Sequence, residues 1–296
     1  MNITILGGTG FVGRSLLNYL AKTKNKVTVI TRNREKNKKI LVYPNVKLVE
    51  ANVHNLEELK THTKKTDALI NLIGILNEKG HSGKGFRKSH SDLARIVLGA
   101  CKSNNIKRLL HMSALNADPK GPSHYLRTKG EAESYLMTYG KRFTNITVFR
   151  PSVIFGKNDS FVLRFSTLLD FMPFLFPLAC HDAKFAPVFV DELSKFMIDS
   201  LENTKSFNKG YDLCGPKVYT LKEILELIIK TKNIKTKVIP LPDYASKMQA
   251  MTMEFFPGKP FSVDNYNSCK IDSVCKSDFI FYSDLETIIP TYISSN

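Results

Sequence analysis

Tyr125 and Lys129 are the pair of residues whose types and spacing best suit proton chemistry. On a helix, residues four positions apart share a face, so the phenol and the ammonium group can point toward one site. A nearby cation lowers the pKa of a phenol, which can then exchange a proton with a carbonyl group. Spacing alone is weak support, because Tyr43 and Lys47 show the same interval in a predicted loop. The elements around Tyr125 must therefore decide what it does.

The first half of the chain alternates short β-branched runs with helical patterns. Strands are predicted at residues 3–6, 27–30, 46–49, 68–73, 107–112 and 146–149, and helices at residues 11–21, 56–63, a segment ending near 104, and 123–139. A polar loop rich in glycine and lysine is predicted at residues 79–88. This order predicts an α/β fold with a Rossmann-type, doubly wound parallel sheet. Ser113 then follows the fifth strand, and it joins Tyr125 and Lys129 as a candidate catalytic residue.

The alternation stops at Pro151. Beyond it come proline-rich apolar segments, an amphipathic helix at residues 221–229, a short strand at 237–239 and an irregular tail. We therefore predict two domains, a Rossmann domain at residues 1–160 and a smaller C-terminal lobe at 161–296. The smaller lobe is expected to cap the carboxyl edge of the sheet and to interleave with it.

A glycine-rich turn follows the first predicted strand and opens the first helix. Gly7 permits a tight turn, Gly10 lets the backbone approach a pyrophosphate, and Gly13 lets the helix pack close to the sheet. Unpaired N–H groups at the start of the helix then favour phosphate. Glycine spacing alone is a weak motif, but its place between a strand and a helix makes it specific. Residues 1–160 are therefore predicted to bind NAD(P).

The residues after the second strand indicate which dinucleotide is bound. An acidic residue about 20 positions beyond the motif binds the ribose 2′-hydroxyl of NAD, whereas an arginine accommodates the 2′-phosphate of NADP. Arg32 follows this strand, with Arg34 behind it, and no carboxylate precedes Glu35. The cofactor is therefore predicted to be NADP(H), with NAD(H) less favoured. The alternative is that both arginines belong to a basic surface loop.

Other candidate cofactor contacts lie at the ends of the remaining strands. Asn52 follows the third strand, where a polar side chain can reach the adenine edge, and Gly74 follows the fourth, where backbone must pass close to the cofactor. Lys129 can also anchor the nicotinamide ribose. The candidate set is Gly7, Thr9, Gly10, Phe11, Val12, Gly13, Arg32, Asn52, Val53, Leu72, Ile73, Gly74, Tyr125, Lys129 and Pro151.

The composition is that of a folded, basic protein. The chain is 43% hydrophobic and 24% charged, and its 43 Lys and Arg against 27 Asp and Glu leave a formal net charge of +16. Such a charge suits anionic partners, but no nucleic-acid-binding motif accompanies it. We therefore expect a solvated Lys-rich surface, compatible with a peripheral contact with an anionic membrane, and no nucleic-acid partner. His54, His62, His81 and His90 show no ligand spacing, so no metal site is predicted.

The cysteines and the chain start bear on the compartment. The five cysteines, Cys101, Cys180, Cys214, Cys269 and Cys275, are odd in number and form no C-x-x-C pair. The start shows no basic segment followed by an apolar signal core. These features predict reduced cysteines and an intracellular, cytoplasmic protein. The most apolar stretch, residues 168–180, is too short to span a bilayer; it is expected to pack within the lobe, or alternatively to contact a membrane.

Several motifs together resemble a known family. The glycine motif, the Tyr125/Lys129 pair and residues 149–156 (FRPSVIFG) are similar to a short-chain dehydrogenase/reductase of the extended or atypical kind. More narrowly, residues 111–117, 125–129 and 187–191 resemble the NADPH-binding accessory subunit of respiratory complex I (NADH:ubiquinone oxidoreductase) and its bacterial relatives. The resemblance covers most of the chain and is densest at 107–192. It implies a tightly held NADPH, a role in assembly or stability rather than turnover, and a peripheral position on the inner face of an energy-transducing membrane, near quinone chemistry.

Two departures from the wider family concern catalysis and cofactor contact. Extended members usually carry two adjacent serines after the fifth strand, the second of which binds the substrate carbonyl, whereas this chain has Ser113 and Ala114. The oxyanion partner is then missing unless Ser113 takes its place. Asn52, where relatives often have Asp, keeps an acceptor and adds a donor.

Three functions stay open. The first is a structural NADP(H)-binding module of a respiratory or quinone-related assembly. The second is an active NAD(P)-dependent reductase or epimerase on a small carbonyl or a sugar nucleotide, and the third is a regulator that senses the NADPH/NADP ratio. Ala114 favours the first, and the intact Tyr125/Lys129 pair keeps the second open.

Overall fold

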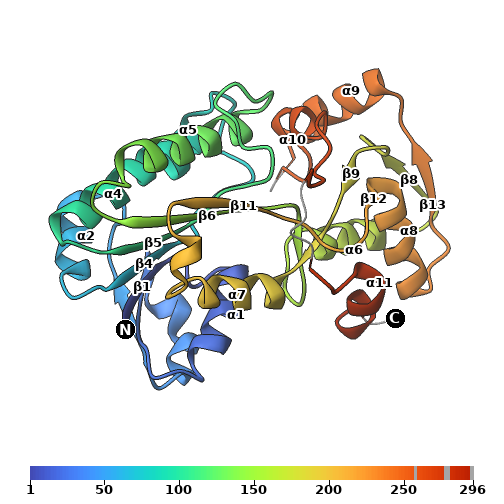
Figure 1. The fold of residues 1–296 in the computed structure, drawn as a ribbon. Coiled ribbons are helices and arrows are strands. Elements are labelled where there is room, and N and C mark those ends of the chain that lie inside the picture. Colours follow the sequence, from blue (N-terminus) through green and yellow to red (C-terminus); the bar gives the residue numbers. More distant parts are fainter. Residues whose placement is uncertain (257–258, 277–280, 294–296) are drawn as a thin grey trace. The chain divides into compact units, whose positions relative to one another are not determined.

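The largest element of the computed structural model is a seven-stranded sheet (Figure 1). Its strands are β1 (Asn2–Leu6), β2 (Lys26–Thr31), β3 (Val46–Glu50), β4 (Ala68–Asn71), β5 (Arg108–Met112), β6 (Asn145–Pro151) and β11 (Lys209–Leu213). They lie in the order β11-β6-β5-β4-β1-β2-β3, and the neighbours from β6 to β3 are parallel. The structure describes residues 1–256, 259–276 and 281–293. The chain winds outward from β1 to β3 and then returns to β4 beside β1, so the predicted Rossmann-type sheet is confirmed.

The helices of this part alternate with the strands. They are α1 (Phe11–Leu20), α2 (Leu56–Thr63), α3 (Lys84–Arg87), α4 (Leu93–Ser103), α5 (His124–Tyr139) and α7 (Val190–Asp199). Short 3₁₀ segments cover Glu35–Val42 and Thr204–Ser206, and a π-helical turn covers Lys88–Asp92. Local capping explains individual helices: the Asn55 side chain accepts the N–H groups of Glu57 and Glu58 and so begins α2.

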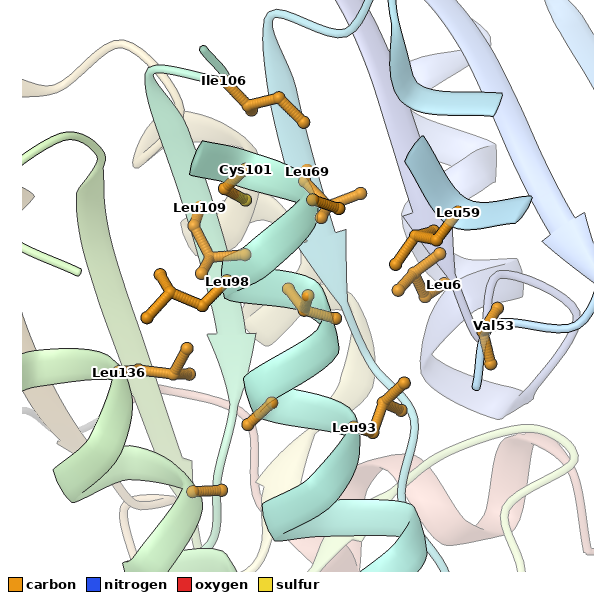
Figure 2. Close-up of a cluster of buried hydrophobic side chains, with 14 of the residues drawn as sticks. Leu6, Val53, Leu59, Leu69, Leu93, Leu98, Cys101, Ile106, Leu109 and Leu136 are labelled. Atoms are coloured by element: carbon orange, nitrogen blue, oxygen red, sulfur yellow. The ribbon is translucent and has the colours of Figure 1, made fainter. Parts of the chain in front are cut away.

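One apolar cluster joins the sheet to α2, α4 and α5 (Figure 2). Leu6, Leu69 and Leu109 contribute from three neighbouring strands, and Leu98 of α4 and Leu136 of α5 pack on them. Such burial stabilises by roughly 1.5–3 kcal/mol for each large side chain. The helices are thereby held on one face of the sheet, which fixes the loops at the ends of the strands.

The chain forms two compact units that interleave in sequence. The first, which we call the sheet unit, consists of Met1–Gly121, Arg127–Arg150 and Asp191–Tyr211. The second, which we call the small unit, consists of Pro122–Leu126, Pro151–Val190 and Asp212–Asn296. The predicted capping of the sheet's carboxyl edge stays a prediction.

The small unit contains short strands and helices around its own core. Its strands are β7 (Ile154–Phe155), β8 (Leu175–Leu178), β9 (Lys184–Phe185), β10 (Val188–Phe189), β12 (Tyr219–Thr220) and β13 (Lys237–Pro240). Its helices are α6 (Val162–Phe171), α8 (Leu221–Lys232), α9 (Asp243–Met253), α10 (Val263–Ser268) and α11 (Leu285–Ile288), followed by a 3₁₀ segment at Ile289–Thr291. The strands pair as β10-β7, β12-β9 and β13-β8. The core includes Leu169 of α6 and Ile228 of α8.

The structure adds elements that the sequence pattern did not predict. The loop predicted at residues 79–88 contains α3, because the Glu78 carboxylate accepts the N–H groups of Gly83 and Gly85 and stabilises the turn. The tail predicted to be irregular contains α9, α10 and α11. α10 begins at a capping box in which Ser262 and Asn265 bond to each other's backbone N–H groups, a pattern that involves no long apolar run.

The prediction that all cysteines are reduced was wrong. A disulfide joins Cys214 and Cys275, whose Cα atoms lie 6.0 Å apart although 61 positions separate them. A C-x-x-C pair consists of cysteines that are close in sequence, and an odd number of cysteines does not say which of them pair. This bond depends instead on the packing of segments that are distant in the sequence. Cys101, Cys180 and Cys269 are free.

The apolar stretch at residues 168–180 divides between core and surface. Leu169, Phe176 and Leu178 are buried, whereas Phe171 and Phe174 are 80% and 82% exposed. Among the described residues no helix has both the length and the apolar character that a membrane span requires. The stretch therefore packs the small unit with one part and presents aromatic side chains to solvent with another.

Candidate functional site

Each glycine of the turn after β1 occupies its position for a different structural reason. Gly7 has φ +80°, a left-handed conformation that glycine adopts without strain. A Cβ at Gly13 would lie 2.5 Å from the Cα of Gly8 and 2.6 Å from the carbonyl oxygen of Gly7, so α1 packs directly on the turn. A Cβ at Gly10 would meet, among the described residues, the Gly7 oxygen at 3.3 Å. The space in front of Gly10 is thus open, while the space at Gly13 is closed.

The start of α1 is able to receive negative charge. Gly10 is its N-cap, no side chain caps it, and its first turn carries no acidic residue. The first N–H groups of a helix lack partners within the helix, and the helix dipole makes this end positive. Phe11 and Val12 begin this turn, and the carbonyl oxygen of the preceding Thr9 accepts Nε of Arg14 at 2.9 Å. No acidic side chain of the first turn of α1 therefore balances the positive charge of its N–H groups.

The end of β4 meets the same turn. A Cβ at Gly7 would lie 3.2 Å from the backbone nitrogen of Ile73 and 3.2 Å from the carbonyl carbon of Leu72. The structure thus brings together two segments that the sequence marked separately as cofactor contacts. Their contact places the fourth strand's end against the glycine turn.

Arg32 directly follows β2 and is exposed. Burial first, and then the charges of Lys88 and Arg32, lower the pKa of His54. The charges of Lys88 and Arg32 therefore both act on His54, against the opposite effect of Asp92. Arg34 differs, because its guanidinium pairs with Glu35 at 3.6 Å and its backbone N–H donates to a Glu50 carboxylate oxygen at 2.7 Å.

The residues after β3 are held by local hydrogen bonds. The Asn52 side-chain oxygen accepts the N–H of His54 at 3.0 Å, and the Asn52 N–H donates to Glu58 at 2.7 Å. Val53 is buried in the apolar cluster of Figure 2. Asn52 is therefore exposed at the end of the strand, whereas the Val53 side chain packs in the core.

Buried polar groups lie at the ends of β4 and β5. The amide nitrogen of Asn71 donates to Nδ1 of His111 at 3.2 Å, so the proton of this neutral imidazole is on Nε2. Burial, and then the charge of Lys129, lower the pKa of His111 to about 3. Within the described part of the chain, His111 Nε2 and the Ser113 hydroxyl are buried without a hydrogen-bond partner. Unpartnered buried polar atoms are costly, and they are expected where a ligand completes the site.

Lys129 lies beside the loop that follows β4. Its Nζ donates to the carbonyl oxygen of Met112 at 2.9 Å, and it would lie 3.0 Å from a Cβ added to Gly74. Burial lowers the pKa of Lys129 to about 8. A buried ammonium beside Gly74 is suited to bind hydroxyl or phosphate oxygens.

His90 links the same loop to α5, although its sequence context gave no ligand pattern. Its Nε2 accepts the N–H of Ile75 at 3.2 Å, so its proton is on Nδ1, which lies 2.8 Å from the Thr128 hydroxyl. Burial first, then the charges of Lys129 and His111, lower its pKa to about 2, which keeps it neutral. His90 thereby positions the Gly74 loop and the Lys129 turn of α5. Its place in a π-helical turn is a structural signal that the sequence did not reveal.

Tyr125 lies one turn before Lys129 on α5, and within the small unit it is bound to α10. The Asp264 carboxylate accepts the backbone N–H groups of His124 and Tyr125 at 2.6 and 3.1 Å. Burial, followed by the charge of Asp264, raises the pKa of Tyr125 to about 12. The expected lowering of the phenol pKa was therefore wrong, because burial and the charge of Asp264 both raise it. Pro151, another predicted contact, is the last residue of β6 and is buried.

A sequence profile of NAD(P)H-binding proteins matches residues 7–160, which include the glycine turn, Arg32 and Lys129. The chain belongs to this NAD(P)H-binding family. A mitochondrial protein of Arabidopsis thaliana, NADH dehydrogenase (ubiquinone) 1 alpha subcomplex subunit 9, is 26% identical over 300 residues, 96% of this chain and 73% of the relative. The NAD(P)H-binding assignment made from the glycine motif is thereby confirmed.

The fold is shared with solved structures of other proteins. An NADPH-dependent quinone oxidoreductase from Escherichia coli has a TM-score of 0.70 at 18% identity and covers 90% of this chain and 89% of its own. UDP-glucose 4-epimerase from Thermus thermophilus, in complex with NAD, has a TM-score of 0.69 at 16% identity and covers 90% and 99%. The same fold thus carries either dinucleotide, and the choice between them depends on local residues.

Proposed function

We propose that this chain is an NADP(H)-binding module of a respiratory NADH:ubiquinone oxidoreductase assembly, in which the nucleotide is held rather than turned over. The observation that carries the nucleotide part is the uncapped start of α1 behind an open Gly10. The name of the Arabidopsis relative supports the assembly part.

The residues of the sheet unit fit a dinucleotide. The turn at Gly7, Gly10 and Gly13, with Thr9, Phe11 and Val12, would receive the pyrophosphate. Asn52 and the backbone at Val53 would border the adenosine half, and Leu72, Ile73 and Gly74 the nicotinamide half. Ser113 would offer its unpartnered hydroxyl, and Lys129 the ammonium that donates to the Met112 carbonyl oxygen. When bound, NADPH supplies a transferable hydride, and this chain's contribution is to bind and orient it. Tyr125 and Pro151, which the sequence also predicts as contacts, belong to the small unit.

Arg32 supports NADP(H) over NAD(H). Arg32 directly follows β2 and is exposed. Guanidinium binds phosphate through paired, charge-assisted hydrogen bonds. The nearest carboxylates in sequence, Glu35 and Glu50, contact Arg34 instead.

Two features favour retention without turnover. Ala114 follows Ser113, so one hydrogen-bond donor to a substrate carbonyl is missing, a loss of about 10²–10³ in rate for oxyanion-type sites. The pKa of Tyr125, raised to about 12, makes its phenol a poor base at neutral pH. A reductase or epimerase remains the second candidate, because the Ser113 hydroxyl is buried without a partner among the described residues and Tyr125 precedes Lys129 by one helical turn.

The partner is proposed to be a respiratory complex, with a peripheral contact on the inner face of an energy-transducing membrane. The net charge of +16 favours an anionic surface. The exposed Phe171 and Phe174 add apolar contact at the end of α6. We expect the protein to sediment partly with membranes and to detach at high salt, since such attraction acts within about 8 Å at physiological ionic strength.

Calorimetric titration with NADPH and NADH tests the nucleotide assignment. We expect NADPH to bind at least about tenfold more tightly, which corresponds to about 1.4 kcal/mol. Arg32→Ala should remove this preference, whereas Arg34→Ala, a matched control, should retain it. Equal affinities, or an unchanged preference in Arg32→Ala, would contradict the NADP assignment.

A further inference from the structure

Helix α9 of the small unit (Figure 1) carries large apolar side chains that face solvent. Tyr244, Met248 and Met251 are 72%, 62% and 52% exposed, and Phe255, just beyond the helix, is 84% exposed. Their spacing of four, three and four residues is the spacing at which side chains return to one face of a helix. Single exposed apolar residues are common, whereas a continuous apolar face marks an interaction site. We call these four residues the α9 stripe.

The opposite face of α9 packs within the small unit. Ser246 and Ala250 are buried. The Ser246 hydroxyl accepts the N–H of Cys180 at 3.3 Å, and the side-chain nitrogen of Gln249 donates to the carbonyl oxygen of Pro177 at 3.0 Å. Residues two positions apart lie on nearly opposite sides of a helix, so Ser246 and Ala250 lie opposite the α9 stripe. The helix is therefore held by one face and presents the other to a partner.

The charges of this segment identify the kind of partner. Exposed lysines lie on α9 and in the segment that leads into it: Lys235, Lys237 and Lys247. The two acids between residues 235 and 254 accept hydrogen bonds from the small unit itself. Asp243 accepts the Tyr266 hydroxyl at 2.8 Å, and Glu254 accepts the N–H of Val263 at 3.1 Å. Cations therefore outnumber acids beside the stripe, and an anionic partner is complementary to them.

We propose that the α9 stripe binds an anionic phospholipid surface, with the helix lying in the plane of the membrane interface. The apolar side chains enter the boundary between headgroups and acyl chains, and Lys247 meets the lipid phosphates. Tyr244 and Phe255 are at the two ends of the stripe, and aromatic side chains are enriched at this boundary. A second copy of the chain is less complementary, because pairing two α9 helices along the stripe brings two cation-rich segments together.

This proposal rests on the peripheral membrane contact of the proposed function and deepens it. It names the helix that makes the contact and the lipid chemistry that the helix recognises. All the contacts that carry it lie within the small unit. Nucleotide binding is a separate matter, so NADPH affinity should be the same in wild type and in every α9 variant.

Fluorescence of the full chain tests insertion of the stripe. The chain contains no tryptophan, so a single introduced tryptophan reports its own surroundings. We expect the emission of Tyr244→Trp to move to shorter wavelength with vesicles of equal amounts of phosphatidylcholine and phosphatidylglycerol, and to be quenched by lipids with brominated acyl chains. Tyr282→Trp is the matched control, because Tyr282 is a tyrosine of the small unit that is 92% exposed and lies outside the stripe. Its emission should stay as in buffer.

Sedimentation with the same vesicles measures affinity. Met248→Ser/Met251→Ser should bind at least about tenfold more weakly than wild type, because less apolar area is buried in the interface. Tyr282→Ser should bind like wild type. Vesicles of phosphatidylcholine alone should bind the wild type at least about tenfold more weakly, since they lack the negative surface charge. Circular dichroism of each variant reports its folding, and Tyr244→Trp tests the stripe even if the methionine variant unfolds.

The results that contradict the proposal are distinct from one another. Wild-type binding to vesicles without an emission shift in Tyr244→Trp, or with an equal shift in Tyr282→Trp, would overturn the assignment to α9 and leave a peripheral membrane contact in place. Equal binding to both kinds of vesicle would overturn the anionic lipid. No binding to either would overturn the membrane contact of the proposed function as well, and the stripe would then belong to a protein interface.

Discussion

The strand ends of the sheet unit and the α10 segment of the small unit treat their buried polar groups differently. In the described chain, the Ser113 hydroxyl and His111 Nε2 are buried without partners at the strand ends. Around α10, by contrast, Asp264 accepts two backbone N–H groups and the buried Ser123 hydroxyl is bonded to Ser268 and to the N–H of Leu126. The buried polar groups around α10 thus have their hydrogen-bond partners within the protein, whereas those at the strand ends need a ligand to supply them.

The difference assigns roles to the two regions. A buried hydroxyl that has its partners contributes to stability, whereas one without partners costs about 1–3 kcal/mol of desolvation. Proteins retain such a cost at functional sites, where a ligand offsets it. We therefore interpret the strand ends as a binding region and the α10 segment as a structural part of the small unit. The following substitutions test this contrast, beginning with the largest expected effect.

Loss of the Cys214–Cys275 disulfide should have the largest effect on stability. The bond closes a loop across 61 positions, for which the chain-entropy estimate is about 4 kcal/mol. We expect Cys214→Ser to lower the free energy of unfolding by about 2–4 kcal/mol in urea titration. The double variant Cys214→Ser/Cys275→Ser should fall by a similar amount, since both lack the same bond. Equal stability of wild type and variants under oxidising conditions would show that the bond does not support the small unit.

Substitutions at Gly13 and Gly10 are expected to have different effects, the first on stability and the second on NADPH binding. Gly13→Ala places a Cβ 2.5 Å from the Gly8 Cα, and we expect a loss of about 1–3 kcal/mol in unfolding free energy. Gly10→Val should cost about 1 kcal/mol or less, because its backbone is extended and the space is open, yet it should abolish NADPH binding. Circular dichroism and calorimetry of the two variants measure both effects. A folded Gly10→Val protein that still bound NADPH would reduce the motif to a turn.

Lys129 should give NADPH binding a pH dependence. Its pKa of about 8 means that the ammonium is lost as pH rises through this value, so affinity should fall as pH rises through about 8 and be level only well below it. Lys129→Met should weaken binding at pH 7 by about tenfold, roughly 1.4 kcal/mol, and should not show that fall. Tyr125→Phe, one turn away, should stay within a few-fold of wild type. A pH profile that is the same in wild type and Lys129→Met would remove Lys129 from the site.

Local patterns in the sequence were sufficient to predict the sheet and the glycine turn. α2 has the predicted bounds, Leu56–Thr63, and β1, β2 and β3 differ from prediction by one residue at their ends. These elements follow from apolar periodicity and glycine placement within one segment. The Gly7 contact with Leu72 and Ile73 also follows, because parallel strands bring their carboxyl ends to one edge.

What the sequence could not give are contacts between distant segments. His90, Asp264 and the Cys214–Cys275 bond each join parts of the chain that share no local pattern. The pKa of Tyr125 was predicted with the wrong sign for the same reason, since Asp264 is far from it in sequence and burial is not visible there. β11, at the edge of the sheet, was missed because it lies beyond the alternating half of the chain.

The most direct test of the contrast is a pair of serine substitutions measured without nucleotide. Ser113 and Ser123 are both buried, at 3% and 0% exposure, but Ser113 lacks a described hydroxyl partner and Ser123 has two. We predict that Ser113→Ala leaves the free energy of unfolding unchanged or raises it by about 1 kcal/mol, whereas Ser123→Ala lowers it by about 1–2 kcal/mol. A loss in Ser113→Ala equal to that in Ser123→Ala would contradict the account, because the strand ends would then be as complete without a ligand as the α10 segment.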